Sequence, residues 1–242
     1  RPELANMVRL VEDGFALSEA SNMPAFLQLR VRACHVRGSF ACKDNRAPAV
    51  SRRQVLDEPA AFDYGRLAHP PATFRQEKLK GEERLPAARR FIVERGLNEV
   101  FPGRRADLGL IVQGGLHNAL VRALRQLGLA DAFGAGEIPL LALNVTYPLV
   151  PEQIRDFCAD KRAVLVVEEG QPEFIEQELA LILRRAAVAT PVHGKDLLPM
   201  AGEYTVEAMA RGLTAFLARH APDMDLRAGR EWLSATDARR AA

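Results

Sequence analysis

Short apolar runs alternate with amphipathic segments over residues 105–195, and this alternation constrains the fold more than any other feature of the sequence. The runs LGLIV, PLLAL and AVLVV contain almost no polar residue, which is typical of strands that are covered on both faces of a sheet. Each run is followed by a segment with apolar residues at helical spacing. This order predicts an α/β fold, with a Rossmann-like parallel sheet and helices on both faces.

The ends of the expected elements carry recognisable residues. Gly128 should stop the first helix, and Pro151 suits the first turn of the second. The expected strands lie within LGLIVQGG, IPLLALNV, AVLVVEE and a less regular VATPVHG, and the expected helices are LHNALVRALRQLG, YPLVPEQIRDFCAD and PEFIEQELALILRR.

The flanking regions are less regular. Residues 4–20 predict a helix and residues 25–31 a strand, a unit too small to bury its own core. A Pro- and Arg-rich stretch follows, and a helix over 82–95 is expected to end it. Such a long irregular stretch indicates a domain boundary. Near the C-terminus, Thr205 should cap a helix, and the residues beyond Ala221 should form a surface tail.

The chain therefore divides into four predicted parts. They are a helix–strand unit (1–40), a connector with a helix (41–104), the α/β domain (105–195), and a C-terminal connector with a helix (196–242).

Composition limits the classes of partner and compartment. The 242 residues carry a net charge of +2, and no apolar run approaches the length of a bilayer-spanning helix, so neither nucleic acid nor a membrane is expected as a partner. Cys34, Cys42 and Cys158 lack C-x-x-C spacing, which argues against a disulfide framework or structural zinc and favours the cytoplasm. The sequence opens on RPELANM rather than on Met, which suggests a fragment of a longer protein.

The glycine turn Gly114–Gly115 leaves two alternatives open. Its backbone N–H groups follow a strand and open a helix, so they could bind a phosphate of a nucleotide or of coenzyme A. The sequence matches neither G-x-G-x-x-G nor a P-loop, and a tight strand-to-helix turn is the simpler explanation.

The histidines give no sequence support for a metal site. None of the five shows H-x-x-x-H spacing, and His117 lies in a first helical turn without a nucleophile signature nearby. We expect His117 to be a surface or packing residue. The full set is His35, His69, His117, His193 and His220.

The adjacent acids Glu168 and Glu169 follow the third apolar run. Neighbouring residues of a strand point to opposite faces, so the two carboxylates should not work as a catalytic acid–base pair while the strand persists. Gln171 and Pro172 fit the N-cap and first-turn positions of the next helix, and the acids that follow suit its positive end. Glu168 and Glu169 are instead expected to make positioning or interface contacts at a strand end.

The ordered set of segments carries a family resemblance. LNVTYPLVPEQIRDFCADKRAVLVVEEGQPEFIEQEL, preceded by GLIVQGGLHNALVRALRQLG and followed by VHGKDLLPMAGEY, resembles the thiamine-diphosphate-dependent 2-oxoacid:ferredoxin oxidoreductases, and among them the indolepyruvate enzymes most closely. The resemblance implies a transketolase C-terminal-like domain. LSEASNMPAFLQLRVRACHVRG is similar to the end of the pyrimidine-binding domain, although Arg30-Val31-Arg32 and Cys34-His35 depart from that family's pattern.

The resemblance also implies a parent activity. In the parent enzyme a 2-oxoacid is oxidatively decarboxylated with thiamine diphosphate, Mg²⁺ and iron–sulfur clusters, ferredoxin accepts the electrons, and coenzyme A accepts the acyl group. This segment has no GDG…N motif and no ferredoxin-like cysteine run. We therefore expect it to bind no cofactor and to have no catalytic residue of its own.

The expected role of the segment is structural. It should contact the other domains or subunits of the parent enzyme, and Tyr147, Glu168 and Glu169 are the candidates for interface or strand-end support. A homo-oligomer is expected. The alternatives are a nucleotide- or coenzyme A-binding module that uses the Gly114–Gly115 turn, and a pure oligomerisation domain.

Overall fold

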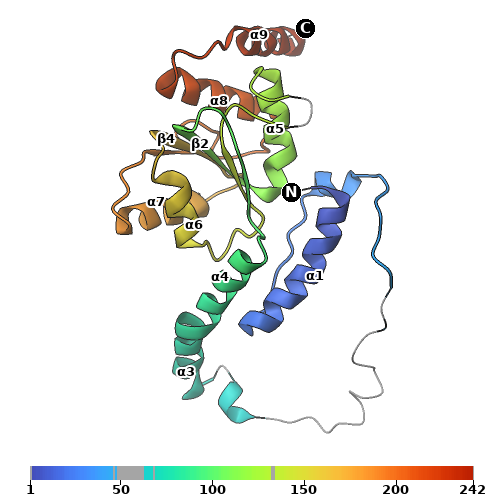
Figure 1. Ribbon diagram of the computed structural model, residues 1–242, viewed down its shortest axis with the longest axis vertical. Coiled ribbons are helices and arrows are strands. Elements are labelled where there is room, and N and C mark those ends of the chain that lie inside the picture. The colour runs from blue at the N-terminus through green and yellow to red at the C-terminus, as the bar shows by residue number, and fades with distance from the viewer. Residues whose placement is uncertain (1, 46, 48–62, 68, 132–133, 242) are drawn as a thin grey trace. The chain divides into compact units, whose positions relative to one another are not determined.

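The computed structural model describes residues 2–45, 47, 63–67, 69–131 and 134–241 (Figure 1). Contacts divide the chain into two compact units: one holds the residues up to Glu3, residues 28–35 and those from Ile92 onward, and the other holds 4–27 and 36–91. The middle of the predicted connector, residues 46, 48–62 and 68, lies outside the described residues. The four-part division of the chain stays a prediction.

The first unit is built on one sheet. Its strand order within the described residues is β1-β3-β2-β4-β5, with β2, β3, β4 and β5 parallel and β1 antiparallel to β3. The predicted parallel sheet is confirmed, although VATPVHG contributes only two strand residues. The strands are β1 (Glu99–Phe101), β2 (Leu108–Gln113), β3 (Leu140–Leu143), β4 (Ala163–Val167) and β5 (Val192–His193).

Helices cover both faces of this sheet, as the apolar runs predict (Figure 1). Alternate strand residues point to opposite faces, so Leu110 and Val112 join one core cluster while Ile111 joins the other. The first cluster includes residues of α5 (His117–Gln126), α8 (Val206–His220) and α9 (Arg227–Ala241), and the second those of α6 (Pro151–Cys158) and α7 (Phe174–Arg185).

Local sequence chemistry accounts for several helix ends. Gly128 takes a positive φ of 73° just after α5, a conformation that glycine adopts without steric cost. Pro151 occupies the first turn of α6. The Thr205 side chain accepts a hydrogen bond from the backbone N–H of Ala208 at 3.2 Å and caps α8. These three predictions are confirmed.

The predicted surface tail beyond Ala221 is wrong. Residues 227–241 form α9, and Leu226 and Leu233 are buried in the core. Gly229 lets α9 pack closely against the C-terminal end of α5, because a Cβ there would lie 2.4 Å from a side-chain methyl of Leu127. The spacing of 226, 229 and 233 is helical, but the many charged residues between them obscured it.

The predicted strand over 25–31 is also wrong. Residues 24–30 have no regular secondary structure, and Val31–His35 form a 3₁₀ turn, η1. A strand requires a neighbour for its backbone hydrogen bonds. No strand pairs with these residues in the part of the chain that the structure describes.

The second unit is helical. Its α1 confirms the predicted helix, although two of the apolar residues in it, Val11 and Phe15, are 44% and 74% exposed. The helix predicted over 82–95 begins earlier than expected, because nearly continuous helical structure runs from Ala72. The elements are α1 (Leu4–Ser21), η2 (Tyr64–Arg66), α3 (Ala72–Leu79), a π-helical segment η3 (Lys80–Arg84) and α4 (Leu85–Glu94), whose last residues belong to the first unit.

None of the helices in the described ranges combines the length and the apolar character needed to cross a membrane.

Candidate functional site

The sequence-predicted residues come together at the carboxyl edge of the parallel strands. Gly114 and Gly115 follow β2, Tyr147 follows β3, and Glu168 and Glu169 follow β4. The strand order reverses at β2, because the chain passes from β2 to β3 on one side and then to β4 on the other. Sheets of this type commonly bind ligands at such a point.

Glu168 caps helix α7. Its carboxylate accepts hydrogen bonds from the backbone N–H of Ile175, at 3.0 and 3.1 Å to the two oxygens, and from that of Glu176 at 3.1 Å. The residue is 5% exposed. A buried carboxylate at a helix N-terminus satisfies N–H groups that have no partner within the helix and complements the helix dipole.

The predicted helix start therefore needs correction. α7 begins at Phe174, and its N-cap residue Glu173 makes no capping bond with its own side chain. Gln171 and Pro172 lie before the helix rather than at its N-cap and first turn. The cap is instead Glu168, which lies just after β4 and six residues before the first residue of α7. The chain turns between them at Gly170, whose φ is 97°.

Glu169 binds a different part of the chain. Its carboxylate accepts hydrogen bonds from Nε and Nη2 of Arg30 at 3.0 and 2.7 Å, and from the backbone N–H of Tyr204 at 2.7 Å. Its own N–H donates to Oε1 of Gln113 at 2.9 Å. The strand ends at Val167, yet the carboxylates of Glu168 and Glu169 still bind separate elements.

Residues 28–35, which we call the strap, are held to the sheet edge by this contact. The strap belongs to the same compact unit as the sheet, and the guanidinium of Arg30 forms a bidentate ion pair with Glu169. Arg32 adds a second pair, with its Nη2 2.9 Å from a carboxylate oxygen of Glu203. That pair is exposed, whereas the side chains of Arg30 and Glu169 are 22% and 24% exposed.

Lys195 and Tyr204 complete the cluster, and sequence reasoning missed both. Nζ of Lys195 donates to the backbone carbonyl of Glu168 at 2.6 Å and to the Tyr204 hydroxyl at 2.8 Å, while that hydroxyl donates to the carbonyl of Pro199 at 2.6 Å. Burial lowers the pKa of Lys195 and raises that of Tyr204. The Gly-Lys pair after VH was the only sequence signal.

The two glycines of the turn pack against protein atoms. A Cβ on Gly114 would lie 2.5 Å from Oδ1 of Asn144, and one on Gly115 would lie 3.2 Å from Cδ of Arg30. Neither glycine has a positive φ of the kind that disfavours other residues. Close packing thus accounts for Gly114, whereas Gly115 is exposed and its nearest neighbour is the side chain of Arg30.

The two glycines should differ in their tolerance of alanine. Gly114→Ala is expected to lower the free energy of unfolding by about 1.5 kcal/mol, because Asn144 is itself fixed by bonds to Leu97 and Glu99. Gly115→Ala should have a smaller effect, because Gly115 is exposed and its Cβ would meet only the side chain of Arg30, at 3.2 Å. Urea unfolding of both variants measures the difference, and equal destabilisation by the two changes would contradict this account.

Tyr147, which follows β3 at the same edge of the sheet, is 63% exposed. His117 is buried, with its ring 4.9 Å from that of Phe101, so it is a packing residue as expected. Cys34 and His35 are both exposed. Within the described ranges, no group of three or more His, Cys, Asp or Glu side chains is placed to hold a metal ion.

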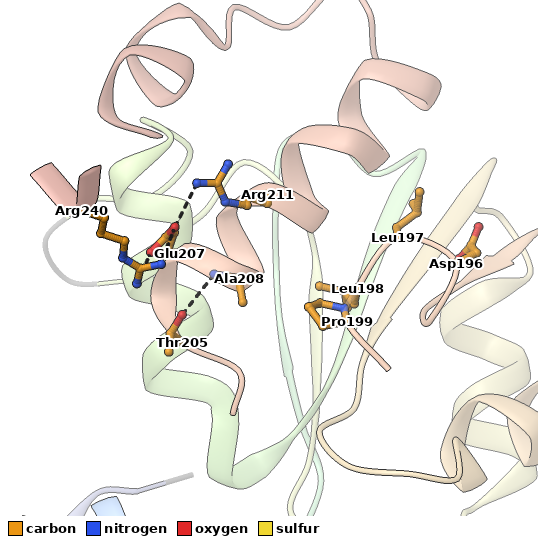
Figure 2. Close-up of a pocket in the computed structure, with 9 residues that line it drawn as sticks. All are labelled: Asp196, Leu197, Leu198, Pro199, Thr205, Glu207, Ala208, Arg211 and Arg240. Carbon is orange, nitrogen blue, oxygen red and sulfur yellow. Dashed lines mark hydrogen bonds and ion pairs between the residues drawn. The ribbon is translucent and has the colours of Figure 1, made fainter. Parts of the chain in front are cut away.

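A cavity of about 500 Å³ lies elsewhere, beside the first turn of α8 (Figure 2). Its wall includes Glu207, which is 9% exposed and which pairs with Arg211 at 2.9 Å and with Arg240 at 2.6 Å. Arg211 also pairs with Asp237 of α9. These ion pairs join α8 to α9, and none of the sequence-predicted site residues lines the cavity.

Comparison with known proteins supports one family. No family model matches the chain. An indolepyruvate oxidoreductase subunit IorA from Methanothermobacter thermautotrophicus is 30% identical over 213 residues, which is 86% of this chain and 32% of that protein. This similarity supports the 2-oxoacid:ferredoxin oxidoreductase family.

Other curated relatives show the same partial coverage. The IorA subunit from Thermococcus kodakarensis is 24% identical over 208 residues, 86% of this chain and 31% of that protein. The chain thus spans about a third of the length of these curated relatives. A solved 2-oxoglutarate:ferredoxin oxidoreductase from Magnetococcus marinus aligns with a TM-score of 0.39 at 18% identity, over 61% of this chain and 24% of that one.

Proposed function

We propose that this chain is the domain-joining part of an indolepyruvate oxidoreductase-type subunit. The parent enzyme would oxidatively decarboxylate a 2-oxoacid, with indolepyruvate as the first candidate, in the cytoplasm. Ferredoxin would accept the electrons and coenzyme A the acyl group. In this proposal the transketolase C-terminal-like domain holds neighbouring parts of the enzyme in register and carries out no chemistry by itself.

One observation carries the proposal: the bidentate pair between Arg30 and Glu169. It connects the strap, which the resemblance assigns to the end of a pyrimidine-binding domain, to the sheet of the transketolase C-terminal-like domain. The pair lies where α/β sheets commonly bind ligands. At this position the chain binds its own preceding segment, which supports a role in joining domains.

The carboxylates at this edge are already bound within the chain, so they offer no ligand set for the Mg²⁺ of thiamine diphosphate. Of the two turn glycines, Gly114 packs against Asn144, whereas Gly115 is exposed. The carboxylate of Glu168 is bound by backbone N–H groups, and that of Glu169 by Arg30 and Tyr204. This supports placing the cofactors in the remaining parts of the parent enzyme. No contact among the described residues favours the nucleotide-binding alternative.

Exposed apolar side chains support partners for both units. In the second unit, Phe15 of α1 is 74% exposed and Phe26 is 87% exposed. In the first unit, Tyr147 and Phe174 are 63% and 67% exposed near the carboxyl edge of the sheet. Each of these four exposed side chains is a candidate contact position for another protein or domain. These positions are the proposed contacts with the rest of the parent enzyme or with a second copy.

The test compares the chain with the complete enzyme. The full-length subunit and its partner subunit should reduce ferredoxin in the presence of indolepyruvate and coenzyme A, whereas the 242-residue chain should show no turnover. Titration calorimetry of the chain with thiamine diphosphate and Mg²⁺ should give no submicromolar binding. Fluorescence of Trp232, the single tryptophan, verifies that the chain is folded in both assays. Tight binding or turnover by the chain alone would overturn the structural role.

A further inference from the structure

Two histidines that are far apart in the sequence meet at the edge of the sheet. His193 ends β5, His220 ends α8, and their Nε2 atoms lie 2.9 Å apart. Sequence spacing predicts no pairing among the five histidines. Two imidazole nitrogens at this distance form a hydrogen bond only when one carries a proton and the other does not.

Asp196 determines which nitrogen of His193 carries a proton. Its Oδ2 lies 2.7 Å from Nδ1 of His193, and its Oδ1 accepts the backbone N–H of Gly194 at 2.9 Å. Burial opposes ionisation of Asp196, but the bonds from His193 and Gly194 outweigh it and keep its pKa below the usual range. An ionised Asp196 requires a proton on Nδ1 of His193. In the neutral pair, Nε2 of His193 therefore accepts the proton of His220.

Adding one proton to the pair keeps a hydrogen bond between the two Nε2 atoms, because one ring still donates and the other still accepts. Adding a second proton places two N–H groups, on two cations, head to head at 2.9 Å. No hydrogen bond is possible in that state, and His193 is only 6% exposed, so water cannot readily separate the charges.

The groups around the pair oppose the second proton. Burial is the largest cause that lowers the pKa of His220 from 6.5, and the positive charges of His193, Arg219 and Arg162 lower it further. The charge of Asp196 acts in the opposite direction. Nη1 of Arg219 lies 3.9 Å from Oδ2 of Asp196. Arg162 donates to the backbone carbonyl of His220.

Two further groups complete these surroundings. The Phe216 ring of α8 packs against both imidazoles, with centroid distances of 5.9 Å to His193 and 5.2 Å to His220. Asp107 pairs with Arg162 at 2.8 Å and so offsets part of its charge.

We propose that His193 and His220 form a clasp that holds one shared proton at most, joins β5 to the C-terminal end of α8, and opens when both rings are protonated. β5 pairs with β4 over only two residues, so few backbone bonds hold this edge. The clasp adds a side-chain connection there. The inference is independent of the proposed function.

The direction of the pH dependence follows from His220. Its pKa in the folded chain is below that in the unfolded chain, so the unfolded chain binds more protons below about pH 6.5. The stabilisation by the clasp is therefore complete above pH 6.5 and is lost as the pH falls through the lower pKa of the folded state.

The direct test is NMR of the ¹⁵N-labelled histidine rings in the 242-residue chain between pH 8 and pH 5. At pH 8 we expect His193 as the Nδ1–H tautomer and His220 as the Nε2–H tautomer. On acidification His220 should take up its second proton below the usual imidazole range, because its pKa is lowered by burial and by nearby positive charge. Independent titration of both rings near pH 6.5, or the opposite tautomers, would overturn the proposal.

Stability provides a second readout. The unfolding midpoint of the wild-type chain should fall between pH 7.5 and pH 5, and His220→Gln, which keeps a hydrogen-bonding side chain without a titrating charge, should reduce that fall at least twofold. The matched control is His69→Gln, because His69 is exposed in the other unit. It should retain the wild-type pH profile. Identical profiles for all three proteins would overturn the clasp.

Discussion

Replacement of Glu168 by alanine is expected to lower the free energy of unfolding of this chain by about 3 kcal/mol. The carboxylate is buried and accepts three hydrogen bonds from two N–H groups at the start of α7. Without it, these donors lose a charged acceptor in a place that water reaches poorly. Urea unfolding followed by Trp232 measures the change, because that residue packs against the core of the same unit.

Two variants test the specificity of this effect. Glu168→Gln keeps an acceptor oxygen and should lose less stability than alanine. Glu173→Ala removes the carboxylate at the formal N-cap position, where no capping bond is made, and should leave the transition nearly unchanged. If Glu173→Ala destabilises the chain as much as Glu168→Ala does, the cap is misassigned.

Replacement of Arg30 by methionine is expected to cost about 2 kcal/mol, and the parent enzyme carrying it should lose at least tenfold in activity. The change removes both bonds of the bidentate pair and leaves a carboxylate that is 24% exposed without its cation. In the proposed function it also loosens the connection between two domains. Unfolding measures the first effect, and indolepyruvate-dependent ferredoxin reduction by the full-length enzyme measures the second.

A double-mutant cycle separates the pair from the surrounding contacts. Arg30→Met, Glu169→Gln and the double variant should give a coupling energy of about 1–2 kcal/mol. Arg32→Met provides the matched control, because Arg32 lies on the same strap and its pair with Glu203 is exposed. This variant should leave the stability close to that of the wild type. No coupling between Arg30 and Glu169 would show that the strap is held by other contacts.

The adjacent acids Glu168 and Glu169 show what local sequence patterns can predict and what they cannot. Alternation along a strand predicts that Glu168 and Glu169 cannot act as a pair while the strand persists, but the strand ends at Val167, before both residues. Their carboxylates bind different elements for another reason, which is the position of their partners in the fold. Local patterns did not identify those partners. N-cap rules place the start of α7 at Gln171 and Pro172, because these rules consider the residues next to a helix and not a side chain that reaches it from a preceding strand end.

The apolar periodicity of the sequence by itself determined the parallel sheet, its two helical layers and several helix ends. Such features depend on residues within one or two turns or strand positions, as with Gly128 after α5 and Thr205 before α8. The same reasoning missed α9, because a charged helix buries few residues, and it predicted a strand over 25–31 that has no neighbour to pair with among the described residues.

Only the tertiary structure decided which charged groups meet. Arg30 and Glu169 are 139 positions apart, and His193 and His220 are 27 apart. Their contacts depend on where strand ends and loops lie in space, and many polar residues could serve equally well in any one of these positions. Hydrophobic burial needs only the right kind of residue at the right period, whereas an ion pair needs two particular groups within about 3 Å of each other. For this reason the fold could be derived from the sequence, and the strap and the clasp could not.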